Sequence, residues 1–93
     1  MPIGYRVAGR VLDLVCPAGL EVTARAAAVR VAEDRIRAHV PERVRLVFVA
    51  DRAGEVRLSP ACLSVLARVR RLCESLVIPV EAVTAPAVVR EAA

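Results

Sequence analysis

The segment RVRLVFVA, at residues 43–50, decides the fold class of this chain. Its first half alternates charged and apolar residues and its second half is continuously apolar, which is typical of a central strand covered on both faces. On either side lies a segment with the apolar period of a helix, residues 21–40 and residues 60–76, and Pro41 ends the first of them. A strand between two helices predicts a largely parallel sheet joined by right-handed crossovers.

The outer segments extend this pattern in both directions. Residues 5–15 are rich in β-branched and aliphatic side chains with Gly9 in the middle, so they form either one bent strand or a tight hairpin. Residues 80–83 predict a short last strand, and Thr84 is the expected N-cap of a final helix with Pro86 in its first turn. Residues 1–93 are thus predicted to be a single α/β domain, a small mixed, largely parallel sheet of about four strands with helices packed against it.

Each long helix is expected to turn one apolar stripe toward the core. In the first helix this stripe consists of Val22, Ala26, Val29, Ala32, Ile36 and Val40. In the second helix it consists of Cys62, Val65, Leu66, Val69, Leu72, Cys73 and Leu76.

The composition narrows the range of functions. The chain is 57% hydrophobic but has one Phe, one Tyr and no Trp, so we expect a core of small aliphatic side chains and some apolar surface left for a protein partner. All 14 basic residues are arginines interleaved with acids, and aromatic residues for base stacking are nearly absent, so nucleic-acid binding is not expected. No apolar run approaches the ~18–20 residues that span a bilayer, and the N-terminus lacks the order of a signal peptide. We therefore expect a cytoplasmic protein without direct membrane insertion.

The cysteines and the single histidine do not indicate a metal or cofactor. Cys16, Cys62 and Cys73 form no Cys-x-x-Cys pair, and on one helix the last two would lie ~16 Å apart, too far for a disulfide. Reduced, buried thiols are therefore expected. His39 has no cysteine or carboxylate at ligand spacing, so no metal site is expected.

Residues for catalysis are also scarce. There is one histidine, with no serine nucleophile motif, no phosphate-cradling glycine loop and no paired carboxylates. Asp13 and Asp51 are expected at strand ends, where aspartate side chains commonly hydrogen-bond the backbone of a loop or cap a helix. We therefore expect that the protein is not an enzyme.

The segment LSPACLSVL, residues 58–66, opens the second helix and holds the most informative residues of the chain. Ser59 followed by Pro60 is the usual pairing of an N-cap with the first helical residue, because the serine oxygen accepts a free backbone N–H and proline has none to lose. A phosphorylation site at Ser59 or Ser64 is the alternative interpretation. Cys62 is expected to face inward as a structural thiol.

Asp51 and the run Ser59-Pro60-Ala61-Cys62-Leu63 resemble the STAS domain of anti-sigma factor antagonists. In that family, Asp-Leu-Ser ends a strand and Asp-Ser-Ser-Gly-Leu opens a helix after a short loop. LDLVCPAGL, residues 12–20, is similar to the family's Gly-Glu-Leu-Asp strand end, and VIPVEAVTAPAVVREA, residues 77–92, is similar to its last strand and helix. The resemblance covers nearly the whole chain in order and spacing.

This resemblance implies a non-enzymatic regulatory module that binds a protein partner, most obviously an ATPase-fold anti-sigma factor or kinase. It places the partner-binding residues at the helix start and the adjoining loop: Asp51, Arg52, Arg57, Ser59, Pro60, Ala61 and Ser64. Ala61 stands where the family's serine accepts phosphate, so phosphorylation at the usual position is lost, and Ser59 and Ser64 are the remaining candidates. The small side chain of Ala61 is expected to let a partner approach closely.

Two alternatives stay open. Some single-domain members of the same family are subunits of membrane-transport ATPase complexes or larger signalling assemblies, and homo-oligomers are also open. In addition, Asp13-Leu14-Val15-Cys16-Pro17 resembles the Cys-Pro-x-Pro start of small sulfur-relay carriers, in which Cys16 would carry a persulfide at a helix N-terminus. Gly19 stands where such carriers have their second proline.

Overall fold

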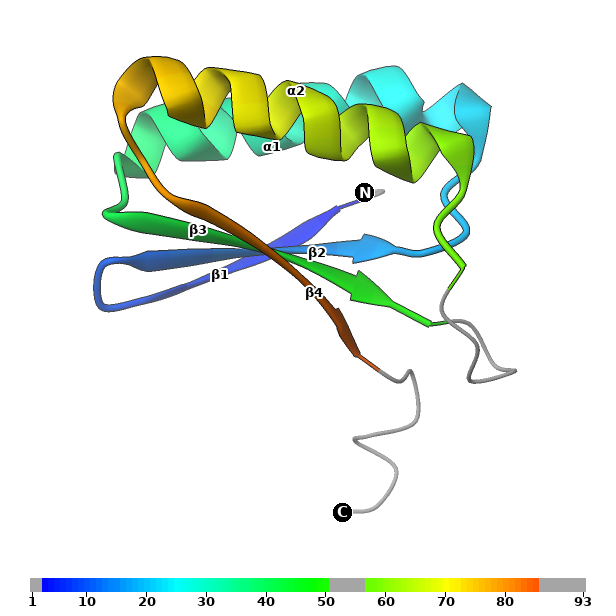
Figure 1. The fold of residues 1–93 in the computed structure, drawn as a ribbon, viewed down its shortest axis with the longest axis horizontal. Coiled ribbons are helices and arrows are strands. Elements are labelled where there is room, and N and C mark those ends of the chain that lie inside the picture. Colours follow the sequence, from blue (N-terminus) through cyan, green and yellow to red (C-terminus); the bar gives the residue numbers. More distant parts are fainter. Residues whose placement is uncertain (1–2, 51–56, 86–93) are drawn as a thin grey trace.

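A four-stranded sheet carries two helices on one of its faces in the computed structural model, which describes residues 3–50 and 57–85 (Figure 1). The elements in chain order are β1 (Gly4–Ala8), β2 (Val11–Pro17), the short 3₁₀ helix η1 (Val22–Ala24), α1 (Arg25–His39), β3 (Arg43–Val49), α2 (Pro60–Leu76) and β4 (Val80–Ala85). The α/β class and the mixed sheet predicted from the sequence are confirmed.

The strands follow one another across the sheet in chain order, β1-β2-β3-β4. β1 runs antiparallel to β2, whereas β2, β3 and β4 are mutually parallel. Of the two interpretations of residues 5–15, the hairpin is correct: Gly9 has φ +62° in the turn, a left-handed conformation that glycine adopts without steric cost.

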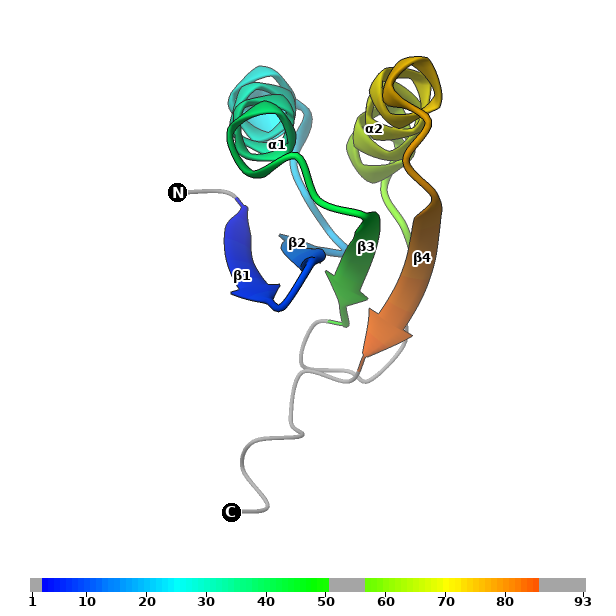
Figure 2. The same ribbon diagram turned by 90° about the vertical axis from the view of Figure 1, so that its left-hand side faces the viewer.

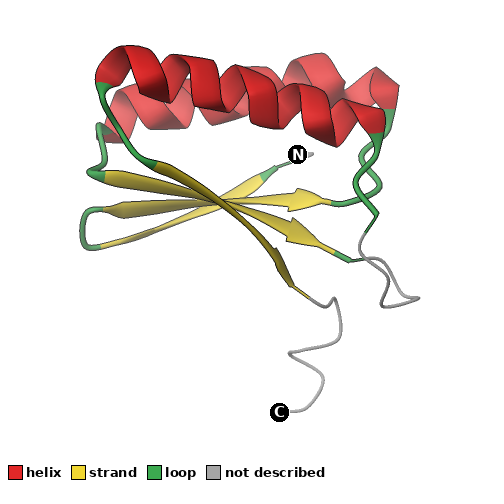
Figure 3. Cartoon of the chain, viewed as in Figure 1, coloured by secondary structure: helices red, strands yellow, loops and turns green. Residues whose placement is uncertain are grey.

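The core lies between the sheet and the helices (Figure 3). Alternate residues of β2 and β3 point into it because successive strand residues face opposite sides of the sheet. The strand residues are Leu12, Leu14, Cys16, Val44, Leu46 and Phe48. The helix residues are Ala28, Val29, Ala32, Ile36, Ala61, Cys62, Val65, Val69 and Cys73.

The expectation that the central strand is covered on both faces is wrong for the described residues. Both α1 and α2 lie on the same side of the sheet (Figure 2), and the other side of β3 carries Arg43, Arg45, Val47 and Val49, none of which is buried. The reason is topological. The strand order advances in one direction from β2 to β4, so two right-handed crossovers both place their helices on one face.

The first helix is shorter than predicted. It begins at Arg25 after η1 rather than at residue 21, and it ends where Val40 takes a left-handed conformation with φ +43°. Val22 and Val40, assigned to the buried stripe from their spacing, are 73% and 69% exposed because they lie beyond the helix ends. Ala26 is also exposed, as is Leu76 in the last turn of α2.

The second helix has the predicted bounds, whereas the end of the chain differs from the prediction. Thr84 is no helix N-cap, because it pairs with Phe48 inside β4 and this pairing continues to Ala85. The helix expected from Pro86 onward lies outside the described residues. Over residues 3–50 and 57–85, no helix combines the length and the apolar character needed to cross a membrane.

Candidate functional site

The predicted site lies at the end of the sheet toward which the parallel strands run and at which both helices begin (Figure 1). Ligands of open α/β folds commonly bind at this end, where strand carboxyl ends meet helix N-termini. The structure places Arg57, Ser59, Pro60 and Ser64 there, on or next to the first turn of α2. The predicted residues Asp51 and Arg52 lie outside the described part of the chain.

Ser59 is the N-cap of α2, as predicted. Its Oγ accepts a hydrogen bond from the Cys62 backbone N–H at 3.2 Å and donates one to the Leu20 carbonyl at 2.6 Å. The Ser59 backbone N–H also donates to the Ala18 carbonyl at 2.9 Å. One residue therefore ties the start of α2 to the loop that follows β2. Because this hydroxyl is used twice within the fold, its geometry argues against Ser59 as a phosphate acceptor.

Ala61 faces the core, not a partner. It is 4% exposed and packs with Cys62 and Val65 on the inner side of the helix. The expectation that its small side chain leaves the site open is therefore wrong. The outward residues of this turn are Pro60 and Leu63, and Ser64 is half-buried.

Two exposed apolar side chains at this end were missed by the sequence reasoning. Leu63 is 52% exposed on the outer side of α2, and Val22 is 73% exposed in η1, which contacts α2. The helical period could have identified Leu63, because it falls opposite the Cys62–Val65 side of the helix. No sequence signal separated Val22 from the buried stripe of α1, since its spacing fits that stripe.

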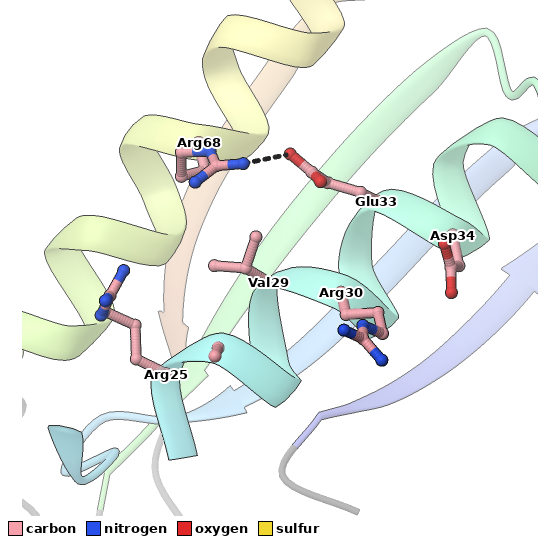
Figure 4. A pocket seen from close by; sticks show the side chains of 7 residues that line it. Arg25, Val29, Arg30, Glu33, Asp34 and Arg68 are labelled. Carbon is pink, nitrogen blue, oxygen red and sulfur yellow. Dashed lines mark hydrogen bonds and ion pairs between the residues drawn. The ribbon is translucent and has the colours of Figure 1, made fainter. Parts of the chain in front are cut away.

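Two guanidinium groups lie near these two side chains, and one acid, Glu21, is exposed directly before Val22. Arg57 is exposed just before α2, and Arg25 extends from the first turn of α1 toward α2 (Figure 4). The N-termini of two helices point to this end, and each adds a partial positive charge. Two guanidinium groups and two helix N-termini outweigh the carboxylate of Glu21, so the local field favours an acidic partner.

A shallow groove of about 480 Å³ continues from Arg25 between the outer sides of the two helices. Figure 4 shows Arg68 reaching across it to Glu33, at 3.5 Å. The other lining residues are Ala26, Val29, Arg30 and Asp34. With both signs of charge on its walls, the groove carries no marked preference for an anion.

Cys16 and Cys62 meet in the core, which the sequence reasoning did not anticipate. Their Sγ atoms are 3.8 Å apart, and the carbonyl oxygens of Pro17 and Ala18 lie 3.0 and 3.2 Å from Cys62 Sγ, so they share the one proton that this thiol can donate. Burial, with a smaller contribution from Cys62, raises the pKa of Cys16 to about 12, and burial raises the pKa of Cys73 to about 11. The thiols of Cys16 and Cys73 therefore stay protonated at neutral pH, and thiolate chemistry is not favoured at either.

The geometry of Cys16 also argues against the sulfur-relay alternative. Its side chain is 0% exposed at the end of β2, and the loop after Pro17 leads into η1 rather than placing the cysteine at a helix N-terminus. A persulfide carrier needs an accessible sulfur with thiolate character.

The two remaining polar residues singled out from the sequence, Asp13 and His39, lie against other side chains of the fold. Asp13 lies in the middle of β2 rather than at its end, between Arg6 and Arg45 at 3.9 and 3.7 Å. The His39 ring lies 5.8 Å from the ring of Tyr5. Within residues 3–50 and 57–85, no three His, Cys, Asp or Glu side chains come together as metal ligands.

Comparison with protein-family models, with curated proteins and with solved structures finds no match for this chain. The STAS resemblance therefore rests on the sequence motifs and on their order along the chain.

Proposed function

We propose that the chain is a non-enzymatic regulatory interaction module that docks a protein partner at the end where α2 begins. The contact area, here named the α2-start surface, consists of Val22, Arg25, Arg57, Pro60, Leu63 and Ser64. The observation that carries the proposal is the exposure of Val22 and Leu63, at 73% and 52%, beside two positive helix ends.

The energetics of this surface fit a protein partner. Fully burying one aliphatic side chain yields about 1.5–3 kcal/mol, so Leu63 and Val22 act as the apolar anchors. Arg25 and Arg57 form a polar rim that orients an acidic partner and speeds its approach.

The STAS resemblance supplies the class of partner in this proposal: an ATPase-fold anti-sigma factor or kinase in the cytoplasm, whose capture would free a sigma factor. The position of the α2 start and the alternation of strands and helices support it. No feature of the described residues favours a role as a transport-ATPase subunit over the binding of an anti-sigma factor or kinase. Regulation by phosphate at the usual position is absent from the proposal, because Ala61 has no hydroxyl and is buried.

The test compares two substitutions of one residue type on one helix. Leu63→Gln makes the first turn of α2 polar, whereas Leu76→Gln makes the same change at its last turn, where Leu76 is 44% exposed. The unmodified protein is used to capture its partner from its native cells, and the purified partner is then titrated against all three proteins by calorimetry.

We expect Leu63→Gln to weaken binding about tenfold or more, because about 1.4 kcal/mol of apolar burial corresponds to a factor of ten in affinity. Leu76→Gln should bind like the unmodified protein, and thermal melts should show that both variants fold. Equal affinities for all three proteins would contradict the placement of the site. A captured partner that is neither an ATPase-fold protein nor a kinase would contradict the assignment of the partner class.

A further inference from the structure

The side of the sheet that faces away from the helices carries an ordered pattern of charged and apolar residues. We name this side the open face; no helix of the described residues covers it (Figure 2). Strand alternation places on it those residues of each strand that do not point into the core. They are Gly4, Arg6, Ala8, Val11, Asp13, Val15, Arg43, Arg45, Val47, Val49, Glu81, Val83 and Ala85.

One row of this face alternates in charge across all four strands. Arg6 is in register with Asp13, Asp13 with Arg45, and Arg45 with Glu81. The row therefore reads plus, minus, plus, minus from β1 to β4. The next row is apolar, since Val15, Val47 and Val83 are in register and Gly4 completes the row in β1.

Within one copy of the chain, the charges around Asp13 do not form close ion pairs. The Asp13 side chain is only 13% exposed, and its carboxylate lies 3.9 Å from Arg6 and 3.7 Å from Arg45, both longer than a hydrogen bond. Its Oδ1 atom is buried and has no hydrogen-bond partner among the described residues. Because Oδ1 is closed to solvent within one copy, only the 13% of the Asp13 side chain that stays exposed can meet a further positive charge.

We propose that a second copy of the chain covers the open face, packed sheet against sheet about a twofold axis parallel to the strands. Such an axis reverses the strand order, so β1 of one copy lies over β4 of the other and β2 over β3. Arg6 then faces Glu81 of the second copy, and Asp13 faces Arg45 of the second copy. All four charges of the row meet their opposites.

The orientation of the axis follows from the same row. A twofold axis along the row, perpendicular to the strands, would place Arg6 over Arg6 and Asp13 over Asp13 of the other copy. Like charges in direct opposition are destabilising, which excludes that arrangement. With the parallel axis, Val15 of one copy also packs on Val47 of the other, as in a sandwich of two aligned sheets.

The size of the face sets the expected strength. Four strands at ~4.8 Å spacing and about six residues at ~3.3 Å rise give each copy about 400 Å² of flat area. Two such faces together fall below the standard size of specific interfaces and in the range of weak, transient ones. We therefore expect a dimer that dissociates in the micromolar range and leaves the α2-start surface free for its own partner.

The decisive experiment uses two charge reversals, Arg6→Glu and Glu81→Arg, studied separately and mixed. Each variant alone places two like-charged pairs across the twofold axis, so its dimer should be at least tenfold weaker than that of the unmodified chain in sedimentation velocity. In an equimolar mixture, each carboxylate introduced at position 6 meets a guanidinium introduced at position 81, and the native Arg6 meets the native Glu81. A heterodimer of near-original affinity is expected.

The mixture also controls for folding. Any loss of stability within one chain is the same in the separate and the mixed samples, so restored dimerisation reports the interface alone. If the mixture stays as monomeric as its components while the unmodified chain dimerises, the parallel twofold arrangement is overturned.

A second pair of variants tests the apolar row. Val47→Asp should abolish the dimer, whereas Val22→Asp, the same change on the helix layer, should leave it intact. The unmodified chain is measured at several hundred micromolar, and the proposal fails if it is a monomer there.

Discussion

Ser59→Ala tests whether the start of α2 is held by its own cap. The substitution removes the hydrogen bond that Ser59 Oγ accepts from the Cys62 N–H and the one that it donates to the Leu20 carbonyl. Loss of a serine N-cap costs about 1 kcal/mol. Leu20 is 5% exposed, and leaving its carbonyl without a donor adds about 1–2 kcal/mol. We expect the free energy of unfolding to fall by about 2–3 kcal/mol, which lowers Tm by roughly 10–20 °C for a domain of this size.

The matched control is Ser75→Ala, at the other end of the same helix. Ser75 Oγ donates to the Leu72 carbonyl at 2.6 Å, but this bond is exposed and water can replace it, so its loss should cost less than about 0.5 kcal/mol. Ser59→Thr keeps both hydrogen-bonding roles and should also cost little. Urea denaturation followed by circular dichroism measures all three variants. A Ser59→Ala cost no larger than the Ser75→Ala cost would refute the claim that this hydroxyl joins α2 to the β2 loop.

Three further predictions concern neighbouring residues. Ala61→Asp buries an unpaired carboxylate and should cost about 3 kcal/mol or more in urea denaturation, whereas a surface position would tolerate it. The pKa of Cys16 is raised to about 12 in the folded chain, against 9.0 for the free thiol, so as pH rises the unfolded chain loses this proton first. The free energy of unfolding should therefore be fully retained below pH 9 and fall as pH rises toward 12. Cys16→Ala should make this fall smaller. Incubation with the captured partner and Mg-ATP should add no phosphate by intact mass, and a phosphate mapped to Ser64 would contradict this prediction.

The sequence alone determined the features that depend on neighbouring residues. The bounds of α2 follow from Ser59 and Pro60 at its start and from its apolar period, because capping and helical periodicity are local properties. The position of β3 could equally be predicted, from its succession of β-branched and aliphatic residues. The burial of Ala61 could also have been predicted, because it lies four residues before Val65 and therefore on the same face of the helix. The prediction from the STAS resemblance considered the size of Ala61 and not the side of the helix on which it lies.

The tertiary structure alone decided which faces are covered and which distant residues meet. Two right-handed crossovers in one direction placed both helices on one side of the sheet, a consequence of strand order that no local pattern contains. The contact between Cys16 and Cys62, 46 residues apart, follows from that packing. The same is true of the charged row from Arg6 to Glu81, because register across a sheet is set by strand pairing, and four separate segments must come together before their charges alternate.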